Sequence, residues 1–239
     1  MIYREAGQFK TTYQTDSAIF PILQDKLFML ALLAISFAVI PVLGSDYFLS
    51  GILIPFLILA LAALGLNILT GYAGQLSLGS AAFMAVGAFA TFNFITRIPG
   101  MPLLLALVLG GLTAAVVGIL FGLPSLRIKG FYLAVATLAA QFFIEWALTK
   151  FGWFTNYSSS GVISAPPMDV FGIAIDSPVK KYLLTLSVVA IMTLAAKNMV
   201  RSGMGRAWMA IRDMDVAAEV IGIPILKTKL LAFAISSFY

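Results

Sequence analysis

Long apolar runs separated by short polar segments dominate the pattern along the chain. Each run has about the twenty residues that an α-helix needs to cross the hydrocarbon core of a bilayer. The pattern therefore predicts membrane-spanning helices at Leu27–Leu43, Phe48–Thr70, Leu76–Ile95, Leu103–Leu123, Phe131–Thr149 and Tyr182–Val200, and the start of another at Leu230. About ten residues follow Leu230, too few to cross, so we expect a bundle truncated within about the seventh span, with C-terminal helices missing.

The composition narrows the class of protein. Hydrophobic residues make up 61% of the chain and charged residues 10%, whereas soluble domains have roughly 45–50% and about 25%. The fold class is therefore an all-α polytopic membrane protein. The sequence has no cysteine and no histidine, which excludes a disulfide framework, a Cys/His metal site and a histidine base, so we expect no catalytic residue, metal or cofactor. It also has no G-x-x-x-x-G-K-[ST] motif, so any ATP must be bound by another chain.

The basic residues indicate the orientation of the spans. With the N-terminus in the cytoplasm, most of the 15 lysines and arginines lie inside and only Arg97, Lys150, Lys180 and Lys181 lie outside, which is the usual bias. The net charge of +5 is thus a topology signal and requires no nucleic-acid partner. We expect a cytoplasmic N-terminal arm at residues 1–26 and a transmembrane domain at residues 27–239.

A polar stretch at Gly203–Ile223 separates the last two apolar runs. Its apolar residues recur at steps of three and four, as on one face of a helix, at Ala207, Ile211, Met214, Ala218 and Ile221. A charged stripe has the same spacing, at Arg212, Asp215 and Glu219. Two interpretations stay open on periodicity alone: a helix that docks into a groove of another protein, or a connecting loop whose arginines fix the topology.

Polar residues also follow one line along the fifth span. Thr137, Gln141, Glu145 and Thr149 are each four residues apart, so they share one face with a drift along the helix. A carboxylate within a span must face protein or water, so this face could line a solute path or bind the amino group of a zwitterion. Alternatively, Glu145 lies near the outer interface, where it is hydrated or pairs with another helix. The pattern slightly favours the alternative for Glu145 and decides nothing for Gln141.

Glycines and small polar residues are concentrated between the second and third spans, in NILTGYAGQLSLGS. Irregular backbone at membrane depth is tolerated only where it is buried or lines a cavity, and broken helices often build solute sites. The candidate pathway residues are Asn67, Gly71, Tyr72, Gly74, Gln75 and Ser77. A tight turn followed by a closely packed helix is the alternative, and the residues alone favour it. In the fourth span, a seam of small residues for helix contact is expected at Gly110, Ala114, Gly118 and Gly122.

Four segments together resemble the branched-chain amino acid ABC transporter permease family, particularly its LivM-type subunits; urea and amide permeases are close relatives. The segments are LNILTGYAGQLSLGSAAFMAVGAFA, LPSLRIKGFYLAVATLA, GRAWMAIRDMDVAAEVIGI and KLLAFAISSFY, in the family's order and spacing. The resemblance covers nearly all of the chain from the second span to its end. Two departures are Ser80, where relatives often have histidine, and the outer loop, where NYSSSG rather than a glycine-rich run follows Thr155.

The resemblance implies an ABC importer permease-type bundle in the bacterial inner membrane that carries branched-chain or related amino acids. The implied partners are a second permease subunit, two ATP-binding subunits, a periplasmic substrate-binding protein and membrane lipid. ATP hydrolysis would occur in the separate ATPase subunits, so the chain itself is not expected to be an enzyme. A urea or amide permease, an ATP-independent carrier that uses Glu145 for ion coupling, and a non-transporting scaffold remain alternatives.

The resemblance also assigns the polar stretch to the family's cytoplasmic coupling loop, at residues 201–228, which inserts into the ATPase. The residues that match the loop are Gly205, Arg206, Ala210, Arg212, Ala217, Ala218, Glu219 and Gly222. Small side chains at Ala217 and Ala218 suit close approach to a groove, and Glu219 offers a charge to a basic residue of the ATPase. The docking interpretation is therefore strongly favoured once the resemblance is considered.

Overall fold

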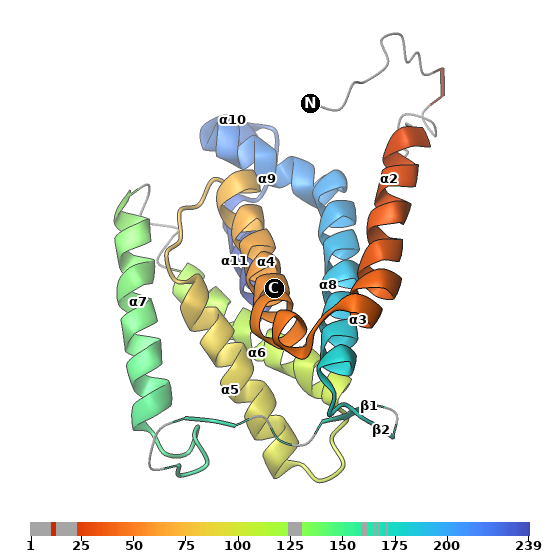
Figure 1. Ribbon diagram of the computed structural model, residues 1–239. Helices are drawn as coiled ribbons and strands as arrows, with labels where there is room; N and C mark the ends of the chain where they lie inside the picture. Colours follow the sequence, from red (N-terminus) through yellow and green to blue (C-terminus); the bar gives the residue numbers. More distant parts are fainter. Residues whose placement is uncertain are drawn as a thin grey trace.

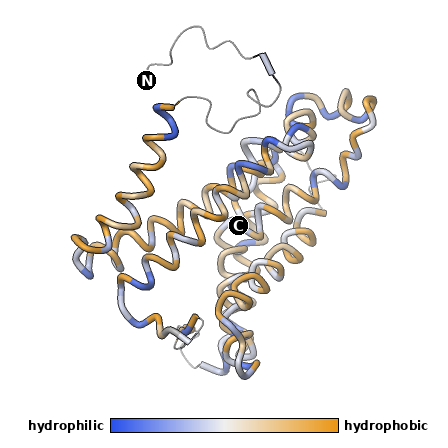
Figure 2. Tube along the Cα trace, turned by 90° about the vertical axis from the view of Figure 1, so that its right-hand side faces the viewer, coloured by the Kyte–Doolittle hydropathy of each residue, from blue (hydrophilic) through white to orange (hydrophobic). Residues whose placement is uncertain are grey.

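The computed structural model describes residues 11–12, 23–123, 131–158, 162–164, 166, 168–170 and 172–239. Within these residues, five helices are long and apolar enough to cross a membrane: Leu23–Leu43, Phe48–Tyr72, Leu103–Gly122, Phe131–Lys150 and Pro178–Arg201. Their apolar surfaces run along their length and polar residues gather toward the ends (Figure 2). The all-α polytopic fold is thus confirmed. Most of the predicted N-terminal arm, 1–26, lies outside the described residues.

Each of the first two spans contains a wide helical turn that is followed by a proline. The first consists of α2 (Leu23–Ala34), the wide turn η1 (Ile35–Val39) and α3 (Ile40–Leu43), and the second of η2 (Phe48–Leu53), α4 (Ile54–Asn67) and η3 (Ile68–Tyr72). Proline has no N–H and its ring collides with the carbonyl four residues earlier, so a helix widens before it. Pro41 and Pro55 each lie two residues after such a turn.

The turn at η1 is stabilised by a neighbouring helix. The N–H of Ile40 bonds to the carbonyl of Ile35, five residues back, so the carbonyl of Ser36 would need the N–H that Pro41 lacks. The hydroxyl of Tyr182, in α8 (Pro178–Arg201), donates to that carbonyl at 3.1 Å. A carbonyl that would be unsatisfied in lipid is therefore paired between helices.

The core of the bundle forms around α6 (Leu103–Gly122), which lies between α5 (Ser80–Arg97) and α11 (Ile225–Phe238) (Figure 1). The predicted small-residue seam is confirmed, because all four of its members are buried. A Cβ on Gly110 would overlap the hydroxyl of Thr91, and one on Gly118 would overlap the hydroxyl of Ser237. The glycines thus let α5 and α11 approach the α6 backbone.

Four predicted helix starts differ from the structure by four or five residues. α2 and α8 begin earlier than predicted, at Leu23 and Pro178 rather than Leu27 and Tyr182. α5 begins at Ser80 rather than Leu76, because Leu76–Gly79 is not helical. Although it has 18 residues, it is not among the five helices long and apolar enough to cross a membrane. α11 begins at Ile225 rather than Leu230, after Pro224. The polar residues Lys227 to Lys229 belong to its first turns, and hydropathy alone does not include them in a helix.

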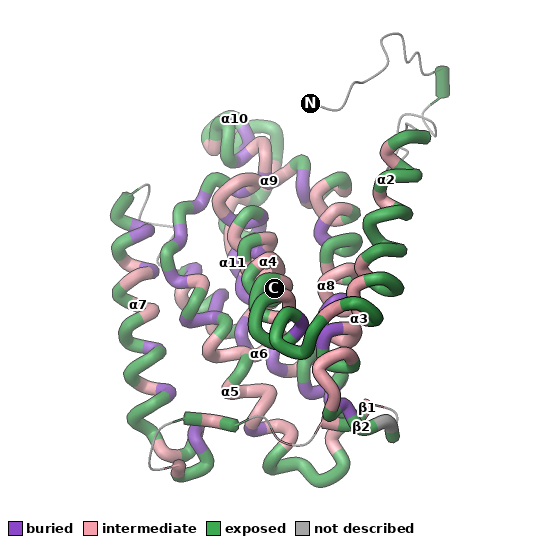
Figure 3. Tube along the Cα trace, viewed as in Figure 1, coloured by how far each residue is buried: buried purple, intermediate pink, exposed green. Residues whose placement is uncertain are grey.

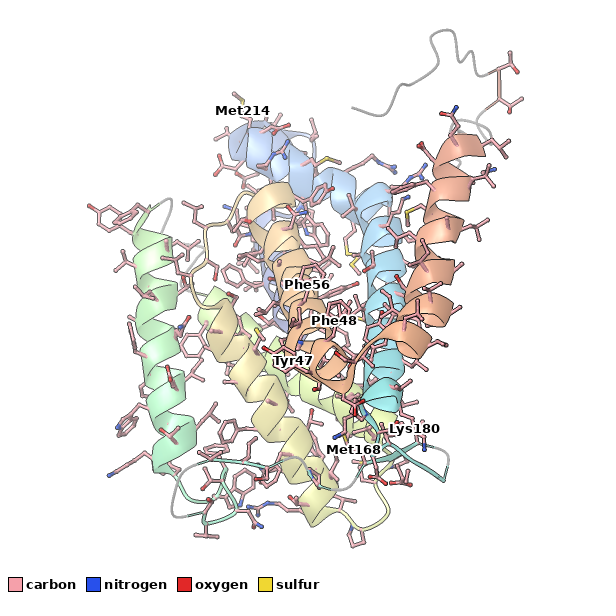
Figure 4. All side chains as sticks on the ribbon, in the orientation of Figure 1. Tyr47, Phe48, Phe56, Met168, Lys180 and Met214 are labelled. Atoms are coloured by element: carbon pink, nitrogen blue, oxygen red, sulfur yellow. The ribbon has the colours of Figure 1, made fainter. Side chains whose placement is uncertain are left out.

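The remaining elements lie at the sides and at one end. α7 (Phe131–Lys150) packs mainly on α5, and its other faces are exposed (Figure 3). After α7, a short hairpin of β1 (Asp169–Val170) and β2 (Ile173–Ala174) precedes α8. Met168 and Lys180 mark this end of the molecule and Met214 marks the opposite end (Figure 4).

Candidate coupling and pathway site

The polar stretch forms two helices rather than one. α9 spans Gly203–Asp213 and α10 spans Asp215–Val220, and between them Met214 has extended backbone, with φ −158° and ψ 102°. The prediction of a single amphipathic helix was therefore wrong. Aspartate is a poor residue for a helix interior but is favourable in a first turn, where Asp215 lies, so the sequence Asp-Met-Asp suits a break.

The break divides the predicted apolar face. Ile211 and Ala218 are buried, but Met214 and Ile221 are 64% and 73% exposed. The buried face of α9 instead consists of Gly205, Trp208 and Ile211, three residues apart. The docking interpretation therefore shifts from a face along the whole stretch to the outer surface of α10.

Trp208 anchors α9 to the bundle. Its side chain is completely buried in a cluster that includes Ile68, Leu69 and Phe233. Its Nε1 donates to the carbonyl of Thr228 at 3.2 Å. The candidate residues named from sequence did not include Trp208, although its three-residue spacing from Gly205 and Ile211 was a visible signal.

Two of the predicted coupling residues determine the shape of the chain. A Cβ on Gly205 would overlap the carbonyl of Val200, so glycine allows the sharp corner between α8 and α9. At that corner the Ser202 hydroxyl donates to the Met199 carbonyl (2.6 Å) and accepts from the Met204 N–H (3.2 Å). It therefore caps both helices.

Gly222 ends α10 in a Schellman motif. Its φ is +89°, a conformation that glycine adopts without strain. Its N–H bonds to the Glu219 carbonyl, and the N–H of Ile223 bonds to the Ala218 carbonyl, both at 3.0 Å. This pattern satisfies the last carbonyls of a helix, so Gly222 also acts within the chain.

The other predicted coupling residues divide between surface and interior. Ala218 is 2% exposed and packs inward, so the expectation that it approaches a partner's groove does not fit the structure. Ala210 is partly buried. Arg206, Ala217 and Glu219 are exposed, and the last two lie on α10 beside the exposed apolar side chains Val216 and Val220.

The glycine-rich segment does not form the predicted tight turn. The second span ends at Tyr72 and α5 begins at Ser80. The residues between form neither helix nor strand, but alternate residues are buried from Ala73 to Gly79, the spacing of an extended chain. Gln75 and Ser77 are each 5% exposed, whereas Leu76 and Leu78 point outward. Of the other pathway candidates, Asn67 and Gly74 are exposed and Gly71 and Tyr72 are partly buried. We call residues 73–79 the extended segment.

α7 holds the far end of the extended segment through Thr137. The Thr137 hydroxyl accepts from the Leu78 N–H and donates to the Ala134 carbonyl, both at 2.9 Å. A Cβ on Gly79 would lie 2.9 Å from the Thr137 carbonyl oxygen, so the two backbones are in close contact.

The predicted polar line on α7 does not stay on one side of the helix. Thr137 is buried, Gln141 is partly buried, and Glu145 and Thr149 are exposed. Residues four apart differ by about 40° around a helix, so three such steps turn the face by about 120°. The Thr149 hydroxyl donates to the Glu145 carbonyl at 2.9 Å. The line thus joins the extended segment only at Thr137.

Arg212 brings the two candidate regions together. Its Nη1 donates to the carbonyl of Gly71 at 2.9 Å, while its Nε and Nη2 contact Oδ1 of Asp213 at 3.0 and 2.9 Å. A Cβ on Gly74, whose φ is +67°, would lie 2.7 Å from Cγ of Arg212. The sequence placed these residues 141 positions apart in two separate candidate sites, with no signal that they touch.

These features define the class of protein: a multi-pass helical membrane protein that carries an anchored helix pair at one end, joined to an unwound stretch between two membrane helices. The chain belongs to the family described as branched-chain amino acid transport system / permease component, which matches residues 48–239.

Two curated relatives are similar to the chain. Both are high-affinity branched-chain amino acid transport system permease proteins LivM, one from Salmonella typhimurium and one from Escherichia coli. Each is 29% identical over 206 residues, which cover 77% of this chain and 48% of the relative. The chain therefore spans about half the length of the curated relatives it matches. No solved structure matches the chain.

Proposed function

We propose that the chain is the permease subunit of an ATP-driven importer that carries branched-chain or related amino acids across the bacterial inner membrane. The family and the names of the two relatives support the solute class. The proposed partners are a second permease subunit, two ATP-binding subunits and a periplasmic substrate-binding protein. The N-terminus and α10 would lie on the cytoplasmic side, the side to which the basic residues assign them.

The observation that carries the proposal is that α9 is packed against the bundle whereas α10 is exposed. α9 is fixed to the bundle by Trp208, whereas α10 presents Val216, Ala217 and Val220 to the outside, with Glu219 among them. An apolar helix surface with a charged residue suits a groove on a soluble partner. Because α8 and α11 directly precede and follow the pair, a movement imposed on α10 would tilt two membrane helices.

The mechanism proposed here requires no chemistry by this chain. Closure of the two ATP-binding subunits would displace α10, and hydrolysis would release it. A displacement of this kind shifts the equilibrium between inward- and outward-open states only if α10 binds the ATPase differently in the two. The extended segment would line the solute path, with Gln75, Ser77 and the adjoining Thr137 as polar groups at its buried side.

A crosslinking experiment tests the proposal. The 239 residues contain no cysteine, so Ala217→Cys would be the single thiol in this part of the permease, paired with cysteines along the groove of the co-expressed ATPase. We expect a crosslink whose yield changes with ATP. Ala218→Cys is the matched control, because the neighbouring residue is buried and should not react. Absence of any crosslink to Ala217→Cys in membrane-inserted protein would contradict the proposal.

A secondary carrier is the second candidate, because Glu145 is exposed on a membrane-spanning helix. A carboxylate in that position is a candidate for ion coupling. Uptake of radiolabelled leucine, isoleucine, valine and urea separates the possibilities. Uptake that requires the ATPase subunits supports the importer and identifies its solute. Uptake that survives their removal but stops when the ion gradient collapses and is lost in Glu145→Gln supports the carrier, and ATPase binding without uptake of any solute supports a scaffold.

A further inference from the structure

We propose that Arg212 transmits the movement of the α9–α10 pair to the extended segment, so that the ATPase acts on the solute path through one arginine. This inference rests on the proposed function. It differs from the role that the family resemblance implies for Arg212, which is contact with the ATPase. In the structure its guanidinium is directed into the chain, toward Gly71.

The contact with Gly71 serves the end of a membrane helix. The last carbonyls of a helix have no partners within it and carry the negative end of the helix dipole. Two of them are satisfied by the chain itself, because the N–H of Ala73 bonds to Ile68 and the N–H of Gln75 bonds to Leu69. The Gly71 carbonyl accepts from Arg212. Arg212 therefore caps the second span from a different helix, through a charge-assisted hydrogen bond, which is stronger than a neutral one.

The same side chain presses on the start of the extended segment. Gly74 has no side chain, which allows its backbone to lie against Cα, Cβ and Cγ of Arg212. Asp213 holds the guanidinium from the other side at 2.9 Å. The arginine is thus fixed to α9 by its neighbour and touches the chain both before and after the helix ends at Tyr72.

The extended segment is suited to move when Arg212 moves. Within the described part of the chain the single sheet is β1–β2, so the segment is not held in a hydrogen-bonded ladder. The N–H groups of Ala73 and Gln75 bond back to the end of the second span, Thr137 holds the other end at Leu78, and Arg212 contacts Gly74 between them. A shift of α9 would therefore act on the segment at Gly74, directly beside Gln75 and two residues before Leu76.

Spin labels can follow the movement of α10 and the movement of the extended segment separately. In the full complex in nanodiscs, one label is placed at Val216→Cys on α10 and, in a second sample, at Leu76→Cys on the extended segment. Both side chains are exposed in this chain, at 66% and 49%. Each labelled parent is first shown to retain ATP-dependent uptake, so that the label at position 216 is known to be accepted at the docking surface. The EPR line shape is compared without nucleotide and with ATP plus vanadate. We expect both labels to respond in the parent protein.

Arg212→Ala should abolish the response at position 76 and leave the response at position 216 unchanged. The nucleotide-dependent change in the ratio of the two spectral components at position 76 should shrink about tenfold, the effect of one charge-assisted hydrogen bond. Arg212→Lys keeps the charge but not the fork that reaches Gly71 and Asp213 together, so it should restore part of the response. Arg206→Ala is the matched comparison, because it removes an exposed arginine of α9 whose Nη1 donates to the Arg201 carbonyl at 3.5 Å. Arg206 is itself a candidate coupling residue, so the test is that position 76 responds in this variant whenever position 216 does.

The outcomes separate this inference from the proposed function. A parent complex in which position 216 does not respond to nucleotide would contradict the proposed function. A response at position 216 without one at position 76 would overturn only the role of Arg212. The same holds if position 76 still responds in Arg212→Ala, or if Arg212→Ala removes both responses, because the arginine would then serve docking itself.

Discussion

α9 and α10 are consecutive helices in one polar stretch, yet they have opposite relations to the rest of the chain. α9 buries Gly205, Trp208 and Ile211, whereas α10 buries only Ala218 of its six residues. Under the proposed coupling role, the difference means that residues matching the family's coupling loop need not touch the partner. Some of them hold the motif in place, and only the exposed remainder is available for contact.

The largest effect that would test this comparison is expected from Trp208→Ala. Replacing a fully buried tryptophan costs about 3–5 kcal/mol, and here it also leaves the Thr228 carbonyl without the indole donor. We expect a large loss of thermal stability of the detergent-solubilised protein, measured by fluorescence-detected size exclusion. Trp146→Ala, at a residue that is 53% exposed on α7, is the control. Equal stability of the two variants would disprove the anchoring role.

Gly222→Ala should have the next largest effect. A residue with a Cβ pays roughly 1–2 kcal/mol in the left-handed region, and Gly222 has φ +89° with no atom near the added Cβ. The melting temperature should fall by a few degrees. Gly203→Ala is the control, because Gly203 begins α9 without a positive φ, and alanine there should be neutral or stabilising. A drop in both variants would mean that the cap geometry is not the cause.

Val220→Asp should separate docking from folding. Val220 is 83% exposed, and exposed substitutions usually change stability by no more than about 0.5 kcal/mol; an anion in the last turn of α10 adds a helix-dipole cost of about 0.3–1 kcal/mol. A charge in an apolar docking surface should nevertheless reduce ATP-dependent uptake strongly. The measurement is uptake per unit of membrane-inserted protein, with Val216→Ala as a milder change on the same surface. Loss of inserted protein in proportion to uptake would mean that Val220 supports the fold.

Glu219→Lys should have the smallest effect on stability, and unlike the other variants it should stabilise the protein slightly rather than destabilise it. Glu219 lies in the last turn of α10, where the helix dipole favours a cation by about 0.3–1 kcal/mol. The variant should therefore be as stable as the parent or slightly more so, while uptake falls because the charge offered to the ATPase is reversed. Normal uptake with normal insertion would remove Glu219 from the docking surface.

The sequence predicted those parts of the fold that depend on local patterns. Runs of about twenty apolar residues predicted the spans, and the four-residue spacing from Gly110 to Gly122 predicted the face of α6 that is buried. Hydropathy could not distinguish Leu76–Gly79 from the start of α5, because leucines that point outward from an extended chain raise the average as much as helical ones do.

The candidate sites were less predictable because they depend on contacts across the chain. Periodicity indicated a continuous helix through Met214, whereas two flanking aspartates favour a break there. Ala218 matched the docking motif, but its burial follows from the packing of α10 against α9 and α11. The contact between Arg212 and Gly71 joins residues that no local pattern relates.

Pro41 gives the first span a polar contact that orients it relative to α8. No residue of α2 is buried, so the packing of α2 alone does little to hold the span at one rotation about its long axis. The proline leaves the Ser36 carbonyl without a backbone N–H, and the Tyr182 hydroxyl donates to that carbonyl, while Ile40 packs on the cluster of Leu49, Tyr182 and Leu186. A residue that prevents a regular helix thus supplies the hydrogen bond that, together with the packing at Ile40, sets which side of the first span faces α8.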